Sequence, residues 1–154
     1  MNQRILVGYH SKGGASKTYA TMIAETFISE GFSTDLIDLK ERIPNVSAYD
    51  VIILGTGVRL SMVYGRWKKM LKQRSLHEKT LYLFLSSGMA MEEPEKAVEK
   101  YLTPLIKRYD LKPVHMISFP GTVPEKWAET DEQKHAVKPE KAKAWAIEII
   151  SLLR

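Results

Sequence analysis

The feature that most constrains the fold is an apolar stretch near the N-terminus that gives way abruptly to small polar residues. Residues 4–10, RILVGYH, are short, largely apolar and partly β-branched, which is typical of a buried strand. Residues 11–18, SKGGASKT, are small, hydroxylic or cationic, and residues 19–28 then carry apolar side chains at helical spacing. The sequence therefore predicts a strand, a small polar loop and a helix in direct succession.

This succession of elements is suited to binding an anion. The first backbone N–H groups of a helix have no partners within the helix, and the helix dipole makes that end positive. Glycines at 13 and 14 allow a close approach of the backbone, and the hydroxyls of Ser11 and Ser16 can donate to phosphate oxygens. We therefore predict a phosphate-binding loop made of Ser11, Lys12, Gly13, Gly14, Ala15 and Ser16. The alternative is an ordinary strand-to-helix turn.

The spacing of the glycines excludes two common nucleotide-binding motifs. A Walker A loop requires Gly, four residues and then Gly-Lys-Ser/Thr, but Ser11 and Ser16 occupy its two glycine positions. The dinucleotide fingerprint Gly-x-Gly-x-x-Gly is absent after the first strand. The later segment 55–57, GTG, has Leu60 in place of the third glycine. What remains is a hydroxyl-rich loop that suits a monophosphate.

The rest of the chain alternates predicted strands with predicted helices. Four further strands are predicted at 33–39, 51–54, 80–85 and 114–118. Helices are predicted at 62–73, from Pro94 onward with a kink or split at Pro104, and at 140–153. Five strands alternating with helices predict an α/β fold with a parallel sheet covered on both faces, in a single domain spanning 1–154.

One long segment, 119–137, carries Pro, Gly, Thr, Asp and Lys and is predicted to be irregular. A loop of that length in a compact domain is often functional, and the alternative is an ordinary surface loop.

Composition narrows the function. The chain has no cysteine, which excludes disulfides, thiol catalysis and cysteine-based metal sites. It shows neither an apolar run of the roughly 18 residues that a membrane span needs nor a signal peptide, so a cytoplasmic location is expected.

The formal net charge is +5, with basic clusters at 66–69 and 138–143. These clusters favour anionic partners or a membrane surface, the alternative being solvated helix faces, and no nucleic acid partner is expected.

Three predicted loops are expected to converge on one ligand. In a doubly wound sheet of order 2-1-3-4-5, ligands bind beyond the carboxyl ends of strands one and three. The loops 11–16, 55–64 and 86–92 would meet there, with Tyr64 as a weaker candidate for stacking. We predict that a flat ring lies between the second and third loops, in contact with Thr56, Gly57, Val58 and Arg59 on one side and Ser86, Ser87, Gly88 and Met89 on the other.

Two segments, YHSKGGAS at 9–16 and GTGVR at 55–59, resemble the flavodoxin-like family. The resemblance is to the branch containing the menaquinone-dependent protoporphyrinogen dehydrogenases, which has a Thr/Ser-rich loop, an aliphatic–Arg pair after strand three and an aromatic in the next helix, here Trp67. It implies a three-layer sandwich with a five-stranded parallel sheet of order 2-1-3-4-5, and FMN bound non-covalently as a redox centre.

The chain departs from that branch in two respects. Serine replaces the usual loop threonine at 11 and 16, which keeps the hydroxyl. The segment after the fifth strand is shorter and more polar than the part of the dehydrogenase associated with its membrane substrate. The resemblance therefore supports FMN binding more strongly than protoporphyrinogen oxidation.

Two function hypotheses follow. In the first, the protein is an FMN-binding redox protein, an electron carrier or a flavin-dependent oxidoreductase, acting on a partner protein or a quinone-like acceptor, with peripheral membrane contact through its basic surface. In the second, it binds another phosphorylated ligand without redox activity. Positive charge at Arg59 and along the following helix stabilises a reduced flavin, which favours two-electron exchange in the first case.

Overall fold

The structure is a computed structural model, which describes residues 3–11, 14–59, 62–63, 65–121 and 137–154. Its central sheet has the strand order β2-β1-β3-β5-β6, and β4 pairs with β3 off this path. The five strands on the path are parallel to one another. They are β1 (Arg4–His10), β2 (Ser33–Asp38), β3 (Val51–Arg59), β5 (Thr80–Ser87) and β6 (His115–Pro120). Because β4 lies off the path, β5 and β6 are the fourth and fifth strands of the parallel sheet. The predicted flavodoxin-like order 2-1-3-4-5 is thus confirmed.

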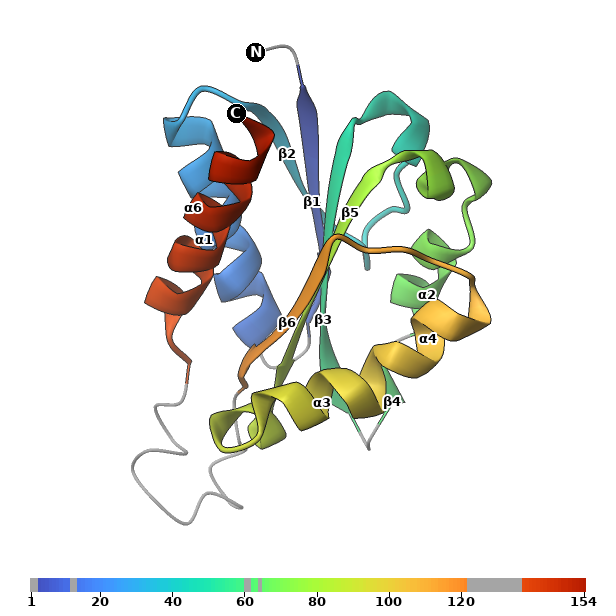
Figure 1. Ribbon diagram of the computed structural model, residues 1–154, viewed down its shortest axis with the longest axis vertical. Coiled ribbons are helices and arrows are strands. Elements are labelled where there is room, and N and C mark those ends of the chain that lie inside the picture. Colours follow the sequence, from blue (N-terminus) through green and yellow to red (C-terminus); the bar gives the residue numbers. More distant parts are fainter. Residues whose placement is uncertain (1–2, 12–13, 60–61, 64, 122–136) are drawn as a thin grey trace.

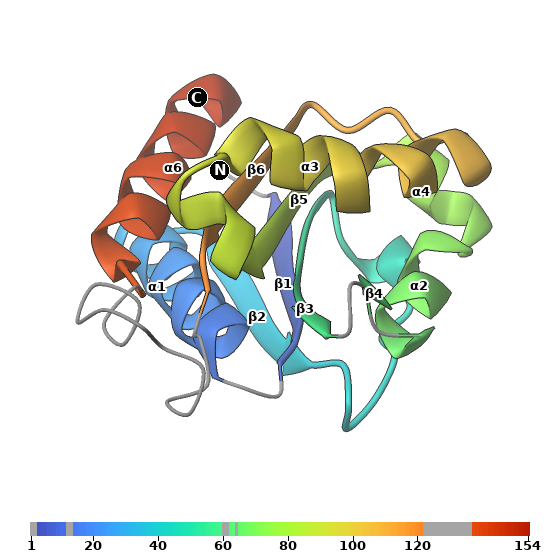
Figure 2. The ribbon, with the colours of Figure 1, turned by 90° about the horizontal axis from the view of Figure 1, so that it is seen from below.

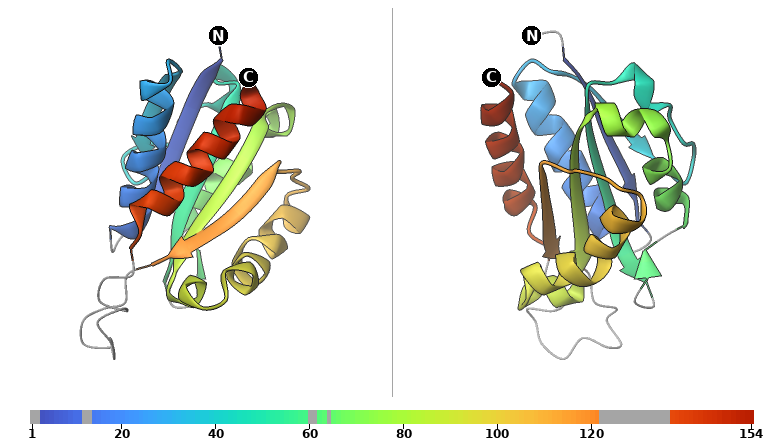
Figure 3. Two further views of the ribbon diagram at one scale, coloured as in Figure 1. Left: turned by 60° about the vertical axis from the view of Figure 1, so that its left-hand side comes forward. Right: turned by 45° about the vertical axis from the view of Figure 1, so that its right-hand side comes forward.

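Helices cover both faces of the sheet and give the molecule three layers (Figure 1). On one face, α1 (Ala15–Ser29) packs beside α6 (Pro139–Leu153). The other face carries α2 (Gly65–Leu71), α3 (Pro94–Tyr101) and α4 (Thr103–Arg108), as the two views of Figure 3 show. Short 3-10 turns, η1 (Val46–Ala48), η2 (Arg74–Glu78) and η3 (Gly88–Met91), complete the connections. No helix in the described part of the chain is long and apolar enough to cross a membrane.

The sheet separates two apolar clusters, because successive side chains of a strand point to opposite faces. On β1, Ile5 and Val7 join the cluster beneath α1 and α6, whereas Leu6 joins the cluster beneath α2, α3 and α4. The first cluster is rich in aromatic rings, and Trp145 packs edge-on against both Tyr82 and Phe84. Burial on both faces explains why the central strands read as continuous apolar runs.

The prediction of a helix at 62–73 was wrong in its first part. Residues Met62–Val63 form β4, an antiparallel partner of the end of β3, and α2 begins only at Gly65. The apolar residues Trp67, Met70 and Leu71 are buried at helical spacing, which is the signal that the sequence showed. Periodicity alone did not reveal that β3 continues past Leu54 and folds back on β4.

Prolines mark the two helices after β5 as predicted. Pro94 occupies the first turn of α3, where its missing N–H has no helical acceptor to lose. Pro104 lies in the first turn of α4, and the chain is split at Leu102 between the two helices. The final strand and helix also form, with slightly shifted ends, since β6 runs to Pro120 and α6 begins at Pro139.

Gly55 is required by packing inside the sheet. It pairs with Phe84 on β5, and a Cβ atom added to Gly55 would lie 1.8 Å from Cζ of the Phe84 ring. Phe84 is fully buried, so its ring has no free space into which to move. The absence of a side chain at 55 therefore serves an internal aromatic ring, not a ligand.

We expect Gly55→Ala to destabilise the protein by about 1–3 kcal/mol, the usual range for overpacking a filled core. Urea unfolding followed by circular dichroism measures the effect. Gly65→Ala is the matched control, because a Cβ there meets no atom within 4 Å. Phe84→Leu should reduce the cost of Gly55→Ala. An equal cost in both backgrounds would contradict the packing argument.

Candidate cofactor-binding site

The candidate site lies at the carboxyl edge of the sheet, where the parallel strands end together. This edge is at the bottom of Figure 1, while both chain termini lie at the top. Figure 2 looks onto this edge from below. Because β1, β3 and β5 are parallel, the strand ends that precede the three predicted loops lie at one edge of the sheet.

The first connection is shorter than predicted. β1 ends at His10 and α1 begins at Ala15, so Ala15 and Ser16 belong to the helix rather than to the loop. Lys12 and Gly13 lie outside the described residues. Ser11 Oγ accepts a hydrogen bond of 2.9 Å from the N–H of Gly14, which has a left-handed φ of 91°. Gly14 is also the N-cap of α1 and provides no capping side chain for the helix.

A hydrogen bond between two serine hydroxyls joins the start of α1 to the end of β5. Ser16 Oγ and Ser86 Oγ lie 2.7 Å apart in a hydrogen bond in which either can donate. Both serines are buried, with exposed fractions of 1% and 5%. Because one is in the first turn of α1 and the other is near the end of β5, the bond fixes the start of the helix against the sheet.

The predicted second loop is largely strand. Thr56 and Gly57 belong to β3 and pair with Leu85 and Ser86 of β5. Thr56 is fully buried, and its hydroxyl donates to the carbonyl of Gly57 at 3.0 Å. The reading of 55–57 as loop was wrong because glycines usually interrupt strands, whereas here Gly55 pairs with both β1 and β5, and Gly57 pairs with Ser86 of β5.

Beyond Gly57 and Ser86, the ends of β3 and β5 take different partners. Val58 and Arg59 pair with Val63 and Met62 of β4, whereas Ser87 pairs with Pro120 of β6. The two strands therefore separate at the level where the sequence placed a flat ring. Among the predicted ring contacts, Val58 and Met89 are half-buried and Gly88 is exposed.

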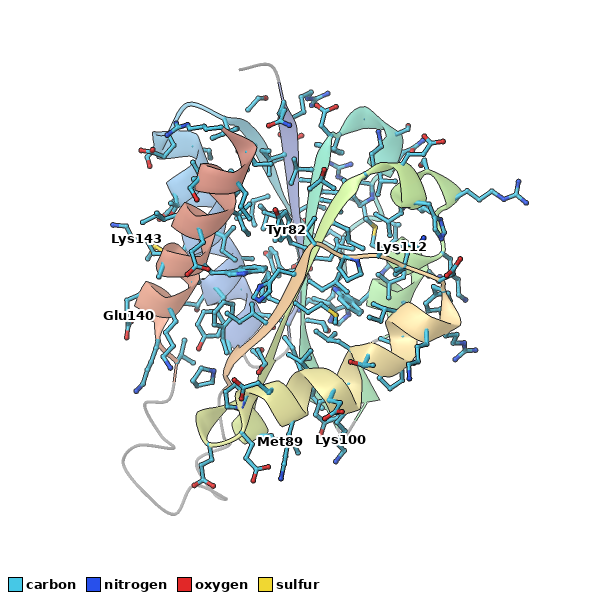
Figure 4. All side chains as sticks on the ribbon, in the orientation of Figure 1. Tyr82, Met89, Lys100, Lys112, Glu140 and Lys143 are labelled. Atoms are coloured by element: carbon cyan, nitrogen blue, oxygen red, sulfur yellow. The ribbon has the colours of Figure 1, made fainter. Side chains whose placement is uncertain are left out.

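Ser87 adds an unusual feature to this edge. Its exposed fraction is 8%, and its Oγ has no hydrogen-bond partner among the described residues. A buried hydroxyl without a partner costs free energy, so this group favours a ligand that can supply one. Met89 follows in η3, at the lower edge of the molecule in Figure 4.

Tyr19 on α1, which was not among the predicted site residues, helps to hold α1 at this edge of the sheet. Its hydroxyl donates to the carbonyl of Pro120 and accepts from the backbone N–H of Lys138 at 3.1 Å. Burial raises the pKa of Tyr19 above its usual value near 10, so its contribution to stability is complete below pH 10 and is lost as the pH rises further. The available signal in the sequence was its hydroxyl group, the polar atom of a side chain that lies among the apolar residues of the buried face of α1.

Trp67, Tyr64 and Arg59 were also named from the sequence, whereas His115 was not. Trp67 is fully buried in the core beneath α2, which leaves no exposed face for stacking. Tyr64 and the side chain of Arg59 lie outside what the structure describes. His115 accepts a hydrogen bond of 2.9 Å from the indole N–H of Trp145, which is part of the core. The described residues contain no cluster of His, Asp or Glu that could hold a metal ion.

A comparison of the sequence with models of protein families shows to which family the chain belongs. A family model for the flavodoxin domain matches residues 6–129. The chain belongs to the flavodoxin domain family. Among curated proteins, none matches the sequence significantly.

Solved flavodoxins share the fold of this flavodoxin domain. Oxidised flavodoxin 1 from Bacillus cereus superposes with a TM-score of 0.68 at 18% identity, covering 96% of this chain and 97% of its own. Flavodoxin from Fusobacterium nucleatum bound to flavin mononucleotide gives 0.65 at 13% identity, covering 97% and 98%. Rubredoxin oxygen:oxidoreductase from Desulfovibrio gigas gives 0.63 at 17%, covering 97% of this chain and 36% of its own. The narrower resemblance to the protoporphyrinogen dehydrogenases stays a prediction.

The Ser16–Ser86 bond in this flavodoxin domain can be tested by a double-mutant cycle. Ser16→Ala and Ser86→Ala should each destabilise the ligand-free protein by about 1–3 kcal/mol, because each leaves a buried hydroxyl unpaired. The double variant should cost less than the sum, since both partners are then removed. Urea unfolding gives the three free energies, and strictly additive effects would contradict the bond.

Proposed function

We propose that this flavodoxin domain binds FMN non-covalently and acts as a redox protein. The observation that carries the proposal is the joining of α1 to the end of β5 by Ser16 and Ser86 at the carboxyl edge of the sheet. Around this contact lie the positive end of α1 with Ser16 in its first turn, Ser11 of the β1–α1 connection, and the strand ends of a flavodoxin domain.

The residues present fit a phosphate group. Ser11 Oγ accepts from Gly14 N–H, so its own hydroxyl hydrogen remains available to donate. The same holds for Ser16 whenever Ser86 is the donor of their shared bond. The first N–H groups of α1 receive no side-chain cap from Gly14 and can donate as well. In this proposal, residues 11–16 hold the phosphate of FMN.

The fit of the ring rests on the separation of β3 and β5. Gly57 and Val58 would lie along one side of the isoalloxazine, with Gly88 and Met89 along the other. The unpartnered hydroxyl of buried Ser87 would donate to or accept from a polar atom of the ring or its ribityl chain. When bound, FMN supplies the capacity to accept and pass on electrons, and these residues orient it and exclude water from its inner side.

The acceptor in this proposal is a quinone-like compound or a partner protein. The positive charge of the chain, with Arg59 at the end of β3, favours reduced forms of a flavin that carry negative charge. That preference supports two-electron exchange and hence a quinone-type acceptor over a one-electron carrier. A phosphate loop by itself would also serve another phosphorylated ligand, so the ring and the phosphate have to be tested separately.

We expect Ser11→Ala/Ser16→Ala to weaken FMN binding by about 1–3 kcal/mol, the range for hydrogen bonds to a charged group. Riboflavin has the same ring without the phosphate, so its affinity should change little. Quenching of flavin fluorescence on titration measures both affinities, and Ser29→Ala at the far end of α1 is the matched control. Equal losses for FMN and riboflavin would place the phosphate elsewhere. No binding of either flavin by the unaltered protein would refute the proposed function.

A further inference from the structure

The positive charge of this protein is concentrated on one surface. Residues 38–42 and 66–74 contain seven cationic and two anionic side chains, a net charge of +5. The whole chain has 23 cationic and 18 anionic residues, so the remaining 16 and 16 cancel. We call this surface the basic ridge, and its cations are Lys40, Arg42, Arg66, Lys68, Lys69, Lys72 and Arg74.

Hydrogen bonds hold the two segments of the ridge side by side. Arg66 Nε donates to the carbonyl of Leu39 at 2.8 Å, near the start of α2. Beyond the end of α2, Gln73 Nε2 donates to the carbonyl of Pro44 at 2.8 Å, and Gln73 Oε1 accepts from Val46 N–H. Residues 39–46 therefore run along the length of the helix, and the charges of both segments share one surface.

The charges of the ridge are accessible and are not neutralised by ion pairs. Six of its seven cations are exposed, and Lys68 is half-buried. The ion pairs found among the described residues join Arg4 to Asp35, Lys96 to Glu93 and Arg154 to Glu30, and so include none of the ridge cations. A surface of this kind attracts a negatively charged partner and accelerates its association.

One end of the ridge lies beside the candidate flavin site. Leu39, whose carbonyl binds Arg66, donates its N–H to the carbonyl of Tyr9 at 2.8 Å. Tyr9 is two residues before Ser11, where the proposed phosphate loop begins. A partner seated on the ridge would therefore contact the molecule next to the proposed cofactor.

We propose that the basic ridge is the docking surface for an acidic redox protein that supplies electrons to the flavin, an inference that rests on the proposed function. An acidic protein fits better than an anionic membrane because the ridge offers no apolar anchor. Its apolar residues are all buried, namely Leu39, Trp67, Met70 and Leu71. The large apolar side chains exposed elsewhere in the described chain, Ile28, Leu36, Val114, Ile147 and Leu152, are outside the ridge.

The test uses a plant-type ferredoxin as an acidic probe and mitochondrial cytochrome c as a basic one. Calorimetry at low salt should show ferredoxin binding that weakens steeply as salt is added, and no binding of cytochrome c. Lys69→Glu/Lys72→Glu should weaken ferredoxin binding at least tenfold. The matched control, Lys141→Glu/Lys143→Glu, makes the same charge change on α6, on the opposite face of the sheet, and should change it less than threefold (Figure 4).

Three results would overturn the proposal. These are absence of ferredoxin binding at low salt, equal weakening by the two double variants, and binding to vesicles containing phosphatidylserine without binding to ferredoxin. Each titration is run with the FMN-saturated protein and again without added FMN. Failure of FMN to bind therefore refutes the proposed function while leaving the docking result readable.

Discussion

The parallel pairing of β1 with both β2 and β3 is the constraint on which the rest of the structure depends. It places β1 inside the sheet, so that each of its faces must be covered by helices and its side chains must be apolar. Together with the parallel pairing of β3 with β5 and of β5 with β6, it directs the carboxyl ends of all five strands of the sheet path to one edge. The connections that leave that edge are consequently the ones that can meet around a ligand.

Close packing next to the carboxyl edge of the sheet holds the elements of the candidate site in place. Gly55 accommodates the ring of Phe84 in the sheet, and Trp145 of α6 packs edge-on against that ring. Tyr19 joins α1 to the end of β6 and to the residue before α6 through a single hydroxyl. Together these contacts fix the start of α1 relative to β5 and β6, which is the geometry that the proposed phosphate loop requires.

Much of the fold could be predicted from the sequence because its signals are local. Apolar runs bounded by polar turns located β1, β5 and β6, the position after Gly31 located β2, and prolines located the starts of α3 and α4. The extension of β3 to Arg59 and its pairing with Met62 depend on contacts between segments, which residue patterns do not report. For the same reason glycines in GTG were read as loop, although pairing with both β1 and β5 holds Gly55 in a strand.

The candidate site was predictable in its members but not in its connections. Ser16 and Ser86 were both named from their positions after strands, yet their mutual hydrogen bond spans 70 residues of sequence. Likewise, the basic residues at 66–69 were visible as a cluster, but the bonds from Arg66 to Leu39 and from Gln73 to Pro44 show that Lys40 and Arg42 extend it. Long-range contacts of this kind decide whether separate motifs act as one surface.

In the proposed function, FMN binds at the carboxyl edge, between α1 and the ends of β3 and β5. Titration of the ¹⁵N-labelled protein with FMN, followed by amide chemical shifts, tests it directly. Binding at this edge should produce the largest shift changes at Gly14–Lys17, Gly57–Val58 and Ser87–Met89, with little change at the opposite edge near Arg4 and Thr80. Changes centred on that opposite edge, or none at saturating FMN, would contradict it.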